Sequence, residues 1–367
     1  MKIMQIIPSL ASGGAERIVV DLCNEFVDRV EETYLCITQD PAVSDYGFYL
    51  NELSEKVHFK SLNQTKGFHI MNIFRLYKII RKIKPDIVHL HLGTLLYGYV
   101  LSLFFPSIKF FHTIHSLAEK TVANKWLKMT NKFVFQRELI KVIAISDECK
   151  QSYSDFYGLN NAYLIYNGRK SVNASALFPE VKNEISQIKG DSGFLFIHIA
   201  RFHHQKNQQL LIDVFNKLAQ DGLDFKLIVL GDWSFCDEAK ALKLQACERI
   251  YFLGTKTNVQ DYLLCADAFC LTSIYEGLPI SLLEALSCGC IPICTSVGGI
   301  KDVIEDGITG FLAEEADLTS CYSAIKRFVK NGDKIDKHLL VSLFNDRYSI
   351  IHTSESHIQL YQSLIKS

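Results

Sequence analysis

The sequence is poor in the residues that interrupt regular structure. Its 367 residues include seven prolines and 20 glycines, which leaves little room for low-complexity sequence. No segment repeats with the period of a solenoid protein. Hydrophobic residues make up 48% of the chain and charged residues 22%, as in folded proteins with buried cores. The length suffices for two domains of ordinary size.

Motifs for two common kinds of site are also absent. No Gly-x-Gly-x-x-Gly occurs, which argues against a nicotinamide-dependent dehydrogenase. No Asp-x-Asp occurs, and no group of His, Asp and Glu has the spacing of metal ligands. We therefore expect neither a bound metal nor an organic cofactor.

The 11 cysteines are scattered along the chain and include no Cys-x-x-Cys pair. The densest group, Cys288, Cys290 and Cys294, crosses a helix end and a following apolar run, which is poor spacing for zinc. An odd number of scattered cysteines predicts buried free thiols in a reducing cytoplasm.

Signals for secretion and membrane insertion are weak. Residues 1–7 open directly as a strand rather than as a signal peptide. Residues 87–108 lack Asp, Glu, Lys and Arg, but they include two histidines, two glycines and Pro106. They divide better into a strand, a helix over 94–105 and a turn. A dozen helical residues span roughly 18 Å, less than the roughly 30 Å of a bilayer core, so we expect no transmembrane helix.

The net charge of −1 hides an uneven distribution. Residues 1–170 contain 21 basic and 16 acidic residues, whereas the remainder contains 18 and 24. Segment 66–84 interleaves basic and apolar residues at helical spacing. It fits either an anionic membrane surface, which the charge imbalance favours, or an ordinary solvated helix. No recognition motif accompanies the charge, so we expect no nucleic-acid partner.

Short apolar runs alternate with helical segments through both halves of the chain. In the first half we expect strands over residues 2–7, 34–38, 57–60, 87–91, 109–115 and 142–146, and a helix over 15–28. In the second half we expect strands over 194–200, 226–231, 250–253, 268–272 and 291–294, and helices over 207–221, 237–248, 259–265 and 280–287. Buried strands between helices predict parallel sheets covered on both faces.

This pattern predicts an α/β fold of two Rossmann-like, doubly wound domains that face each other across a cleft. Ligands would bind at the carboxyl ends of the strands. The first domain would cover residues 1–170 and the second residues 171–345, joined by a polar linker over 171–191. The tail, residues 346–367, contains an amphipathic helix.

Residues 276–289, EGLPISLLEALSCG, are the most informative stretch. Glu276 and Glu284 are eight residues apart, separated by a Gly-Leu-Pro turn and an apolar helical run. Pro279 suits a helix start, so free N–H groups around residues 280–282 would form an anion site. An anion between two carboxylates fits a sugar nucleotide, whose diphosphate lies between two sets of hydroxyls. The alternative is an ordinary capped core helix with a surface glutamate at each end.

A second candidate anion site follows the strand expected over 194–200. Arg201 and Lys206 are five residues apart in one loop, so both can reach one anion. Arg supplies a bidentate fork and Lys a compact charge, which suits a diphosphate. The alternative is two surface cations. We expect His203 and His204 to be exposed loop residues.

Two segments of the first half carry weaker signals. Gly13 and Gly14 precede a helix and would let a backbone approach a phosphate or sugar closely. In a regular strand Thr113 and His115 share one face, at the carboxyl end of the strand. His112 points to the other face and has no assigned role. A lone histidine is more often structural than functional.

Together these motifs resemble those of glycosyltransferase family 4, the retaining glycosyltransferases of GT-B architecture. Glu276 and Glu284 match the family's E-x7-E element, and the other motifs match in the right order along the chain. The resemblance implies that Arg201 and Lys206, with the helix start, hold the diphosphate in place of a metal. It implies that Glu276 contacts the transferred sugar, with His115 close by, and that Glu284 holds the ribose.

Further roles are implied only through this resemblance. The loop with Gly13 and Gly14 would lie near the acceptor and the donor phosphate, and the tail would cross back onto the first, acceptor-side domain. Other implied donor-site residues are Gly277, Leu278, Pro279, Ser281, Leu282, Gly231, Thr255 and Val259. Turns over 166–168, 297–299 and 309–312 also match and are interpreted as structural.

The resemblance implies transfer of a sugar, with retention of configuration, from a nucleotide-sugar donor on the second domain. UDP is the expected nucleotide on family frequency alone. The acceptor would be a glycan or a lipid-linked molecule. The basic first half favours a lipid-linked acceptor at the inner face of a bacterial membrane, as in surface polysaccharide biosynthesis, and a cytoplasmic or peripheral location. Two alternatives stay open. One is a sugar-nucleotide epimerase or hydrolase of the same fold, and the other is a non-catalytic, membrane-associated scaffold.

Overall fold

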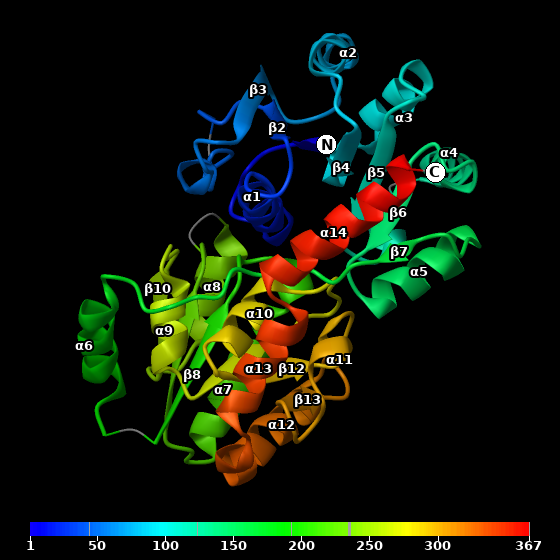
Figure 1. The fold of residues 1–367 in the computed structure, drawn as a ribbon. Coiled ribbons are helices and arrows are strands. Elements are labelled where there is room, and N and C mark those ends of the chain that lie inside the picture. The colour runs from blue at the N-terminus through cyan, green and yellow to red at the C-terminus, as the bar shows by residue number, and fades with distance from the viewer. Residues whose placement is uncertain (44, 123, 192, 234–235, 367) are drawn as a thin grey trace. The chain divides into compact units, whose positions relative to one another are not determined.

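The computed structural model describes residues 1–43, 45–122, 124–191, 193–233 and 236–366 (Figure 1). The chain divides into two compact units, Met1–Lys170 with Tyr348–Ser367, and Ser171–Arg347. Each unit contains one parallel sheet with helices around it. The predicted α/β class with two Rossmann-like units is therefore confirmed.

The first unit contains a seven-stranded parallel sheet in the order β3-β2-β1-β4-β5-β6-β7. Its strands are β1 Lys2–Ile7, β2 Glu32–Gln39, β3 His58–Gln64, β4 Ile87–His91, β5 Lys109–Ile114, β6 Lys141–Ala144 and β7 Tyr163–Leu164. Its α-helices are α1 Gly14–Phe26, α2 Met71–Ile83, α3 Leu95–Phe104, α4 Lys125–Gln136, α5 Asp147–Tyr157 and α14 Ile350–Ile365. The described part of this unit also contains the 3₁₀ turns η1 Leu50–Glu52, η2 Leu92–Thr94 and η3 Ala118–Lys120.

Helices cover both faces of this sheet, which explains why its strands are apolar on both sides. Helices α2, α3, α4 and α5 pack on one face, where Met4 and Ile6 of β1 join their core. Helix α1 packs on the other face against Ile7. Helix α14 covers this second face beside α1, because Phe26 of α1 makes edge contacts with its rings.

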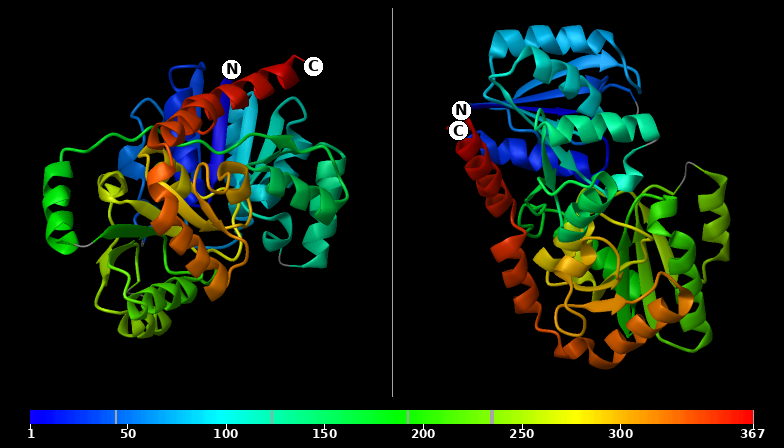
Figure 2. Two further views of the ribbon diagram at one scale, coloured as in Figure 1. Left: turned by 90° about the horizontal axis from the view of Figure 1, so that it is seen from below. Right: turned by 90° about the vertical axis from the view of Figure 1, so that its right-hand side faces the viewer.

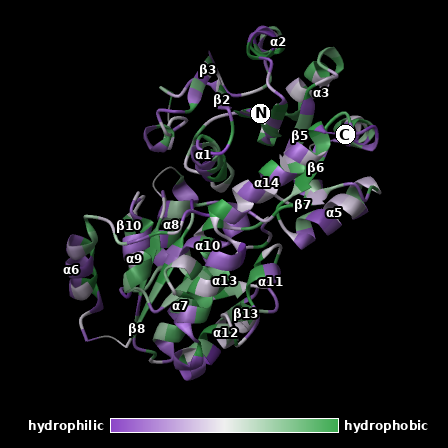
Figure 3. Ribbon diagram, in the orientation of Figure 1, coloured by the Kyte–Doolittle hydropathy of each residue, from purple (hydrophilic) through white to green (hydrophobic). Residues whose placement is uncertain are grey.

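The second unit contains a six-stranded parallel sheet in the order β10-β9-β8-β11-β12-β13. Its strands are β8 Phe194–Ile199, β9 Phe225–Leu230, β10 Ile250–Gly254, β11 Ala268–Leu271, β12 Ile291–Thr295 and β13 Phe311–Ala313. Its helices are α6 Phe178–Lys189, α7 Gln208–Gln220, α8 Asp237–Gln245, α9 Val259–Cys265, α10 Ile280–Ser287, α11 Ile300–Val303, α12 Leu318–Asn331 and α13 Lys337–Arg347, with 3₁₀ turns η4 His204–Lys206 and η5 Gly332–Lys334. Figure 3 shows green, the hydrophobic colour, concentrated on these strands.

The expected linker over 171–191 is wrong for its second half. Phe178–Lys189 forms helix α6, with Pro179 in its first turn. Val181 and Ile185, four residues apart, are buried on one side of it, so a short apolar stripe in a polar segment is enough for a helix. The strands β7 and β13 were not predicted either, because two or three residues show no periodicity.

The segment with the weak membrane signal, residues 87–108, forms β4, η2, α3 and a turn. Among the described helices, none combines the length and the hydrophobicity that a transmembrane span requires. Helix α3 has 10 residues and buries Tyr97 and Leu101 in the core of the first unit.

Candidate functional site

In the second unit, the two loops with the strongest motifs lie side by side. Strands β8 and β11 are neighbours in the sheet, with β9 and β12 on their outer sides, so the strand order reverses between them. Such a reversal places the two following loops on opposite sides of a crevice, where ligands bind in open α/β sheets. The loop after β8 contains Arg201 and Lys206, and the loop after β11 contains Glu276.

Glu276 is the centre of this site. Its Oε1 accepts hydrogen bonds from Lys206 Nζ at 2.6 Å and from Ser273 Oγ at 2.5 Å. Its Oε2 accepts from Gln205 Nε2 at 3.2 Å. The residue is 4% exposed. A buried carboxylate is costly unless it is paired and hydrogen-bonded, so Lys206 and its neighbours make this position possible.

The structure contradicts the alternative of two surface glutamates. Glu284 is 7% exposed, and Glu276 is as deeply buried. Glu284 lies in the second turn of α10, which begins at Ile280 as predicted. Two buried carboxylates on either side of a helix start are unusual for a purely structural helix.

Hydrogen bonds between the two loops fix their spacing. Ile274 N donates to Gln205 O at 2.8 Å, and Gln205 Nε2 donates to Tyr275 O at 2.9 Å. Thr272 Oγ1 lies 3.2 Å from Lys206 O. The sequence pattern did not indicate Gln205 and Ser273 as partners of Glu276, although Gln205 precedes Lys206 and Ser273 lies three residues before Glu276.

The two cations have different settings. Arg201 and the neighbouring His203 and His204 are exposed, as predicted for the histidines. Lys206 is not a free surface cation, since its ammonium group is bound to Glu276. An ammonium group carries three N–H donors, so Lys206 can hold Glu276 and a phosphate oxygen together.

The start of α10 offers backbone donors beside this pair. Among the described residues, no hydrogen-bond partner of the Ile280 and Ser281 amides is found, whereas Leu282 N donates to Pro279 O at 3.2 Å. The expectation of free N–H groups over 280–282 is therefore wrong for Leu282, because the first turn closes on Pro279. Leu278, just before it, is buried.

A glycine positions the backbone of Glu276. Gly298 has a φ of +57°, and a Cβ there would lie 2.1 Å from Glu276 O. Gly299 N donates to Gly277 O at 2.7 Å. The turn over 297–299, interpreted as structural, thus supports the loop that holds Glu276.

The residues predicted to lie near the nucleotide come after strands β9 and β10. Gly231 directly follows β9, and its N–H donates to Gly254 O at 2.9 Å. Thr255 follows β10 and is exposed, and Val259 is the first residue of α9. These loops follow strands β9 and β10 at the same edge of the sheet, farther from the Glu276 loop in strand order than the loop after β8.

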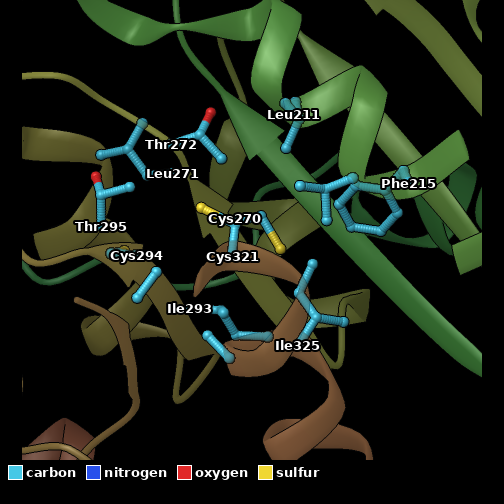
Figure 4. A pocket seen from close by; sticks show the side chains of 13 residues that line it. Leu211, Phe215, Cys270, Leu271, Thr272, Ile293, Cys294, Thr295, Cys321 and Ile325 are labelled. Carbon is cyan, nitrogen blue, oxygen red and sulfur yellow. The ribbon is translucent and has the colours of Figure 1, made fainter. Parts of the chain in front are cut away.

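An apolar cavity lies between α7, α12, β11 and β12 (Figure 4). None of the predicted site residues lines it. Its lining includes Thr272, whose hydroxyl holds the Lys206 loop, and Thr295, whose Oγ1 donates to Ser273 O at 2.7 Å. The cavity is therefore part of the core that supports the site.

In the first unit, His115 joins a chain of polar side chains on the sheet face under α14. His91 Nε2 lies 2.6 Å from Gln5 Oε1, and His91 Nδ1 lies 3.0 Å from His115 Nε2. An amide oxygen only accepts, so His91 donates through Nε2 and its Nδ1 accepts from His115 Nε2–H. This tautomer leaves His115 Nδ1 as an acceptor, and this buried atom has no partner among the described residues.

A second chain runs beside the first and involves α14. His89 Nε2 lies 2.7 Å from Thr113 Oγ1, and His89 Nδ1 lies 2.6 Å from Tyr361 OH. Thr113 and His115 share one face, as predicted, while His112 packs against Phe135 on the other. The histidines of β4 were missed as a group, although their alternate spacing places both on one face.

Burial keeps these histidines neutral. It lowers the pKa of His115 to about 3 and that of His357 to about 3, and that of His112 to about 4. Burial, followed by neighbouring histidines, also lowers the pKa of His89 and of His91. His115 is therefore a neutral hydrogen-bonding group at physiological pH and not a cation.

The stability of the first unit should fall as the pH drops below about 6.5. Unfolded His112 binds a proton below its ordinary pKa of 6.5, whereas folded His112 binds one only near its pKa of about 4. Proton binding therefore favours the unfolded chain in this window, and stability present above it is lost as the pH falls. One such histidine lowers the free energy of unfolding by about 1.4 kcal/mol when the pH reaches about 5.5.

Urea unfolding of the wild type and of His112→Leu at about pH 7.5 and about pH 5.5 checks this. The variant should lose about 1.4 kcal/mol less than the wild type between these conditions. His338→Leu, at an exposed position of α13, should match the wild type. Equal losses in wild type and His112→Leu would contradict the prediction.

The paired glycines have separate places at the end of β1. Gly13 is buried and precedes α1, and Gly14 is exposed as its first residue. Arg17 N donates to Gly13 O at 3.0 Å. Strands β1 and β4 mark the reversal of strand order in the first unit, so this loop and His91 lie at the ligand-binding position of their own sheet.

The cysteines form no site. All 11 are free thiols, and Cys290 and Cys294 are buried. Burial raises the pKa of Cys288 to about 12, which keeps its thiol protonated and unreactive. No group of three or more His, Cys, Asp and Glu residues within the described part of the chain could hold a metal ion.

Two family models match consecutive parts of the chain. Residues 12–170 match the model described as Glycosyltransferase Family 4, and residues 181–339 match Glycosyl transferases group 1. Together they span nearly all of both units and include every motif described above except the tail.

Individual relatives and solved structures agree with these matches. A capsular polysaccharide biosynthesis glycosyltransferase of Staphylococcus aureus is 27% identical over 99% of each chain. The N-acetyl-alpha-D-glucosaminyl L-malate synthase of Bacillus anthracis is 26% identical over 88% of this chain and 86% of its own.

The fold is shared with solved proteins of low identity. HepE of Anabaena, solved in complex with UDP-glucose, superimposes with a TM-score of 0.81 at 19% identity, over 99% of this chain and 100% of its own. A glycosyltransferase of Rickettsia africae gives a TM-score of 0.83 at 19% identity, over 100% and 99%. The chain belongs to glycosyltransferase family 4 and is a glycosyltransferase of GT-B fold.

Proposed function

We propose that the protein is a retaining glycosyltransferase that uses a UDP-sugar and a glycan or lipid-linked acceptor in bacterial surface polysaccharide biosynthesis. The observation that carries this proposal is the buried Glu276 carboxylate, which Lys206 binds at 2.6 Å and which lies four residues before the first residue of α10. A carboxylate accepts from sugar hydroxyls, and the adjacent ammonium group and N–H groups bind a diphosphate.

The donor would bind the second unit with its diphosphate at Arg201, Lys206 and the start of α10. Glu276 would hold hydroxyls of the transferred sugar, and Glu284 would hold the ribose. As the bond between the sugar and the diphosphate breaks, negative charge grows on the leaving phosphate. Fixed cations and backbone dipoles stabilise that charge without a metal, and one such contact is worth about 3 kcal/mol.

The acceptor hydroxyl would attack from the face that the diphosphate leaves. A new bond forms between the sugar C1 and the acceptor oxygen, the C1–phosphate oxygen bond breaks, and the hydroxyl proton passes to the leaving phosphate oxygen. Glu276 suits positioning rather than proton abstraction, because its two oxygens already accept three hydrogen bonds. Nδ1 of His115, which carries no proton in this tautomer, would accept a hydrogen bond from a sugar hydroxyl.

The relatives support the choice of acceptor class. One curated relative, 26% identical over 77% of this chain and 74% of its own, is a UDP-Gal:alpha-D-GlcNAc-diphosphoundecaprenol galactosyltransferase of Escherichia coli. Its acceptor is lipid-linked and its donor a UDP-sugar. The capsular relative from Staphylococcus aureus supports polysaccharide assembly in the same way.

Calorimetric titration with UDP, GDP and ADP tests the donor site. We expect UDP to bind and Glu284→Ala to weaken binding about tenfold or more, since a lost hydrogen bond to a charged group costs about 1.5–3 kcal/mol. Glu248→Ala, at an exposed position of the same unit, serves as the control.

The outcomes separate the proposed function from its alternatives. If no nucleotide binds to the folded protein, the donor site is wrong and a non-catalytic scaffold is favoured. If UDP-sugar is converted at the same rate without an acceptor, the protein is an epimerase or hydrolase. Product analysis with and without acceptor distinguishes these results.

A further inference from the structure

Helices α2, α3 and α4 lie one after another on the same face of the first unit's sheet (Figures 1 and 2). Large apolar side chains are exposed on the outer side of this layer and on the loop that leads into α2. We call this surface the α2–α4 face. Its apolar members are Phe68, Ile70, Met71, Phe74, Leu103, Phe104, Trp126, Met129 and Phe133.

The concentration of aromatic side chains on this face is unusual. Every exposed Phe, Trp and Met among the described residues belongs to it, whereas the exposed large apolar residues elsewhere are Leu, Ile and Val. Trp126 is 79% exposed. The other tryptophan, Trp233, is 2% exposed. Single exposed aliphatic residues are common on protein surfaces, but a grouped set of aromatic residues marks an interaction site.

Helix α4 shows how the sequence produces this surface. Trp126, Met129 and Phe133 recur at helical spacing and form one stripe, while Val134 and Phe135 point into the core. The helix therefore has two apolar sides, of which only one is needed for folding. Helix α2 has the same organisation, with Leu76 in the core and exposed Phe74 on its outer side.

Basic residues surround the apolar ones. The outer sides of α2 and α4 carry Arg75, Lys78, Arg81, Lys82, Lys125, Lys128 and Lys132, and neither helix contains an acidic residue. Within the described part of the chain, none of these seven side chains forms an ion pair. Two of them have other partners, because Arg75 Nη1 donates to Leu62 O at 3.0 Å and Lys128 Nζ lies 4.0 Å from the centre of the Phe156 ring. Between Lys56 and Arg137 the sequence contains 14 basic residues and only two acidic ones. The positive charge of Lys78, Arg81, Lys82, Lys125 and Lys132 is therefore available to an outside partner.

We propose that the α2–α4 face docks the protein onto an anionic lipid bilayer. Trp and Phe insert at the boundary between headgroups and acyl chains, and Lys and Arg beside them bind anionic headgroups. A second copy of the chain fits less well, because two such faces would bring like charges together. This inference concerns a surface outside the donor site, so it stands or fails independently of nucleotide binding.

Vesicle co-sedimentation of the full-length protein, combined with tryptophan fluorescence, tests the proposal. We expect binding to vesicles of phosphatidylcholine with phosphatidylglycerol at low salt, and little binding to phosphatidylcholine alone. Because Trp233 is buried, a blue shift on binding reports on Trp126. Trp126→Phe should keep binding but lose the shift, and Trp126→Ala should weaken binding.

Matched variants distinguish the contribution of charge on the α2–α4 face from the effect of a lower net charge. Lys78→Ala/Arg81→Ala should lower the vesicle partition coefficient about 30-fold, since each well-placed cation contributes about fivefold. Lys326→Ala/Lys330→Ala changes the net charge equally at exposed positions of α12 and should bind like the wild type. Leu244→Ala, at an 89% exposed position of α8, is the control for Trp126→Ala.

Three results would overturn the proposal. The first is a folded wild-type protein that does not bind anionic vesicles. The second is an equal loss in the α2 and α12 pairs, which would indicate a non-specific charge effect. The third is a lipid-independent dimer that Trp126→Ala dissociates, which would assign the face to a second copy. UDP titration of the same variants should match the wild type in every case.

Discussion

Replacing Lys206 with Ala should lower kcat about a hundredfold, with a smaller change in KM for the donor. The ammonium group binds Glu276, four residues before the start of α10, and would hold the proposed diphosphate, which gains charge as the glycosidic bond breaks. An interaction that is stronger in the transition state than in the ground state affects kcat. Losing one such contact costs about 3 kcal/mol, which is roughly a hundredfold in rate.

The same substitution should also weaken folding of the second unit. Lys206 Nζ is 2.6 Å from Glu276 Oε1, and the Glu276 side chain is 5% exposed. Without Lys206, the buried carboxylate keeps Ser273 and Gln205 as its partners among the described residues, and breaking a buried ion pair in this way costs about 3 kcal/mol. Kinetics must therefore be measured at a temperature where circular dichroism shows the variant folded.

Controls distinguish the two effects of Lys206→Ala. Lys206→Arg keeps the charge and should recover most of the stability, and part of the rate. Lys217→Ala removes an exposed lysine paired with Asp221 on the same unit and should leave kcat unchanged. Arg201→Ala should lower kcat by a similar factor with little effect on stability, because Arg201 is exposed. Wild-type turnover in both Lys206→Ala and Arg201→Ala would refute the assigned role.

Gly231→Ala should destabilise the second unit by about 3 kcal/mol or more and should disturb the Arg201 loop. Gly231 has a φ of +134°, which L side chains rarely adopt, and a Cβ there would lie 2.0 Å from Ala200 O. The obstacle is the backbone of the segment that leads into Arg201, so a side-chain rotation cannot relieve the overlap.

Gly222→Ala is the matched control for this prediction. Gly222 also has a positive φ, +79°, but no atom of the described residues beyond its chain neighbours lies within 4 Å of its Cβ position. Its substitution should cost about 1 kcal/mol from backbone strain alone. Urea unfolding of the two variants measures the difference, and equal losses would show that the contact with Ala200 is unimportant.

Local patterns predicted most elements of both sheets. The bounds of β1, β4, α9 and α10 agree with the prediction to the residue, because each is a short apolar run between clear turn residues. The alternation in β5 also predicted which face Thr113 and His115 share. Helix α6 was not predicted, because two apolar residues in a polar segment give only a weak helical periodicity of hydrophobicity.

The candidate site was predictable only in part. The residue types and spacing of Glu276, Glu284, Arg201 and Lys206 indicated a sugar-nucleotide site. That Lys206 binds Glu276 was not predictable, since 70 residues separate them and their contact depends on β8 and β11 being neighbours. The tautomer of His115 depends in the same way on Gln5 and His91, which come from two other strands.

By itself, the sequence determined the fold class, the positions of most strands and helices, and the kinds of side chain at each strand end. These properties follow from short-range periodicity and from turn residues, which act within a few positions along the chain. The tertiary structure decided which strand ends meet, which carboxylates are buried, and that the aromatic residues of α2, α3 and α4 share one exposed face. These properties depend on strand order and helix packing, which join residues far apart in the sequence and leave no local signal.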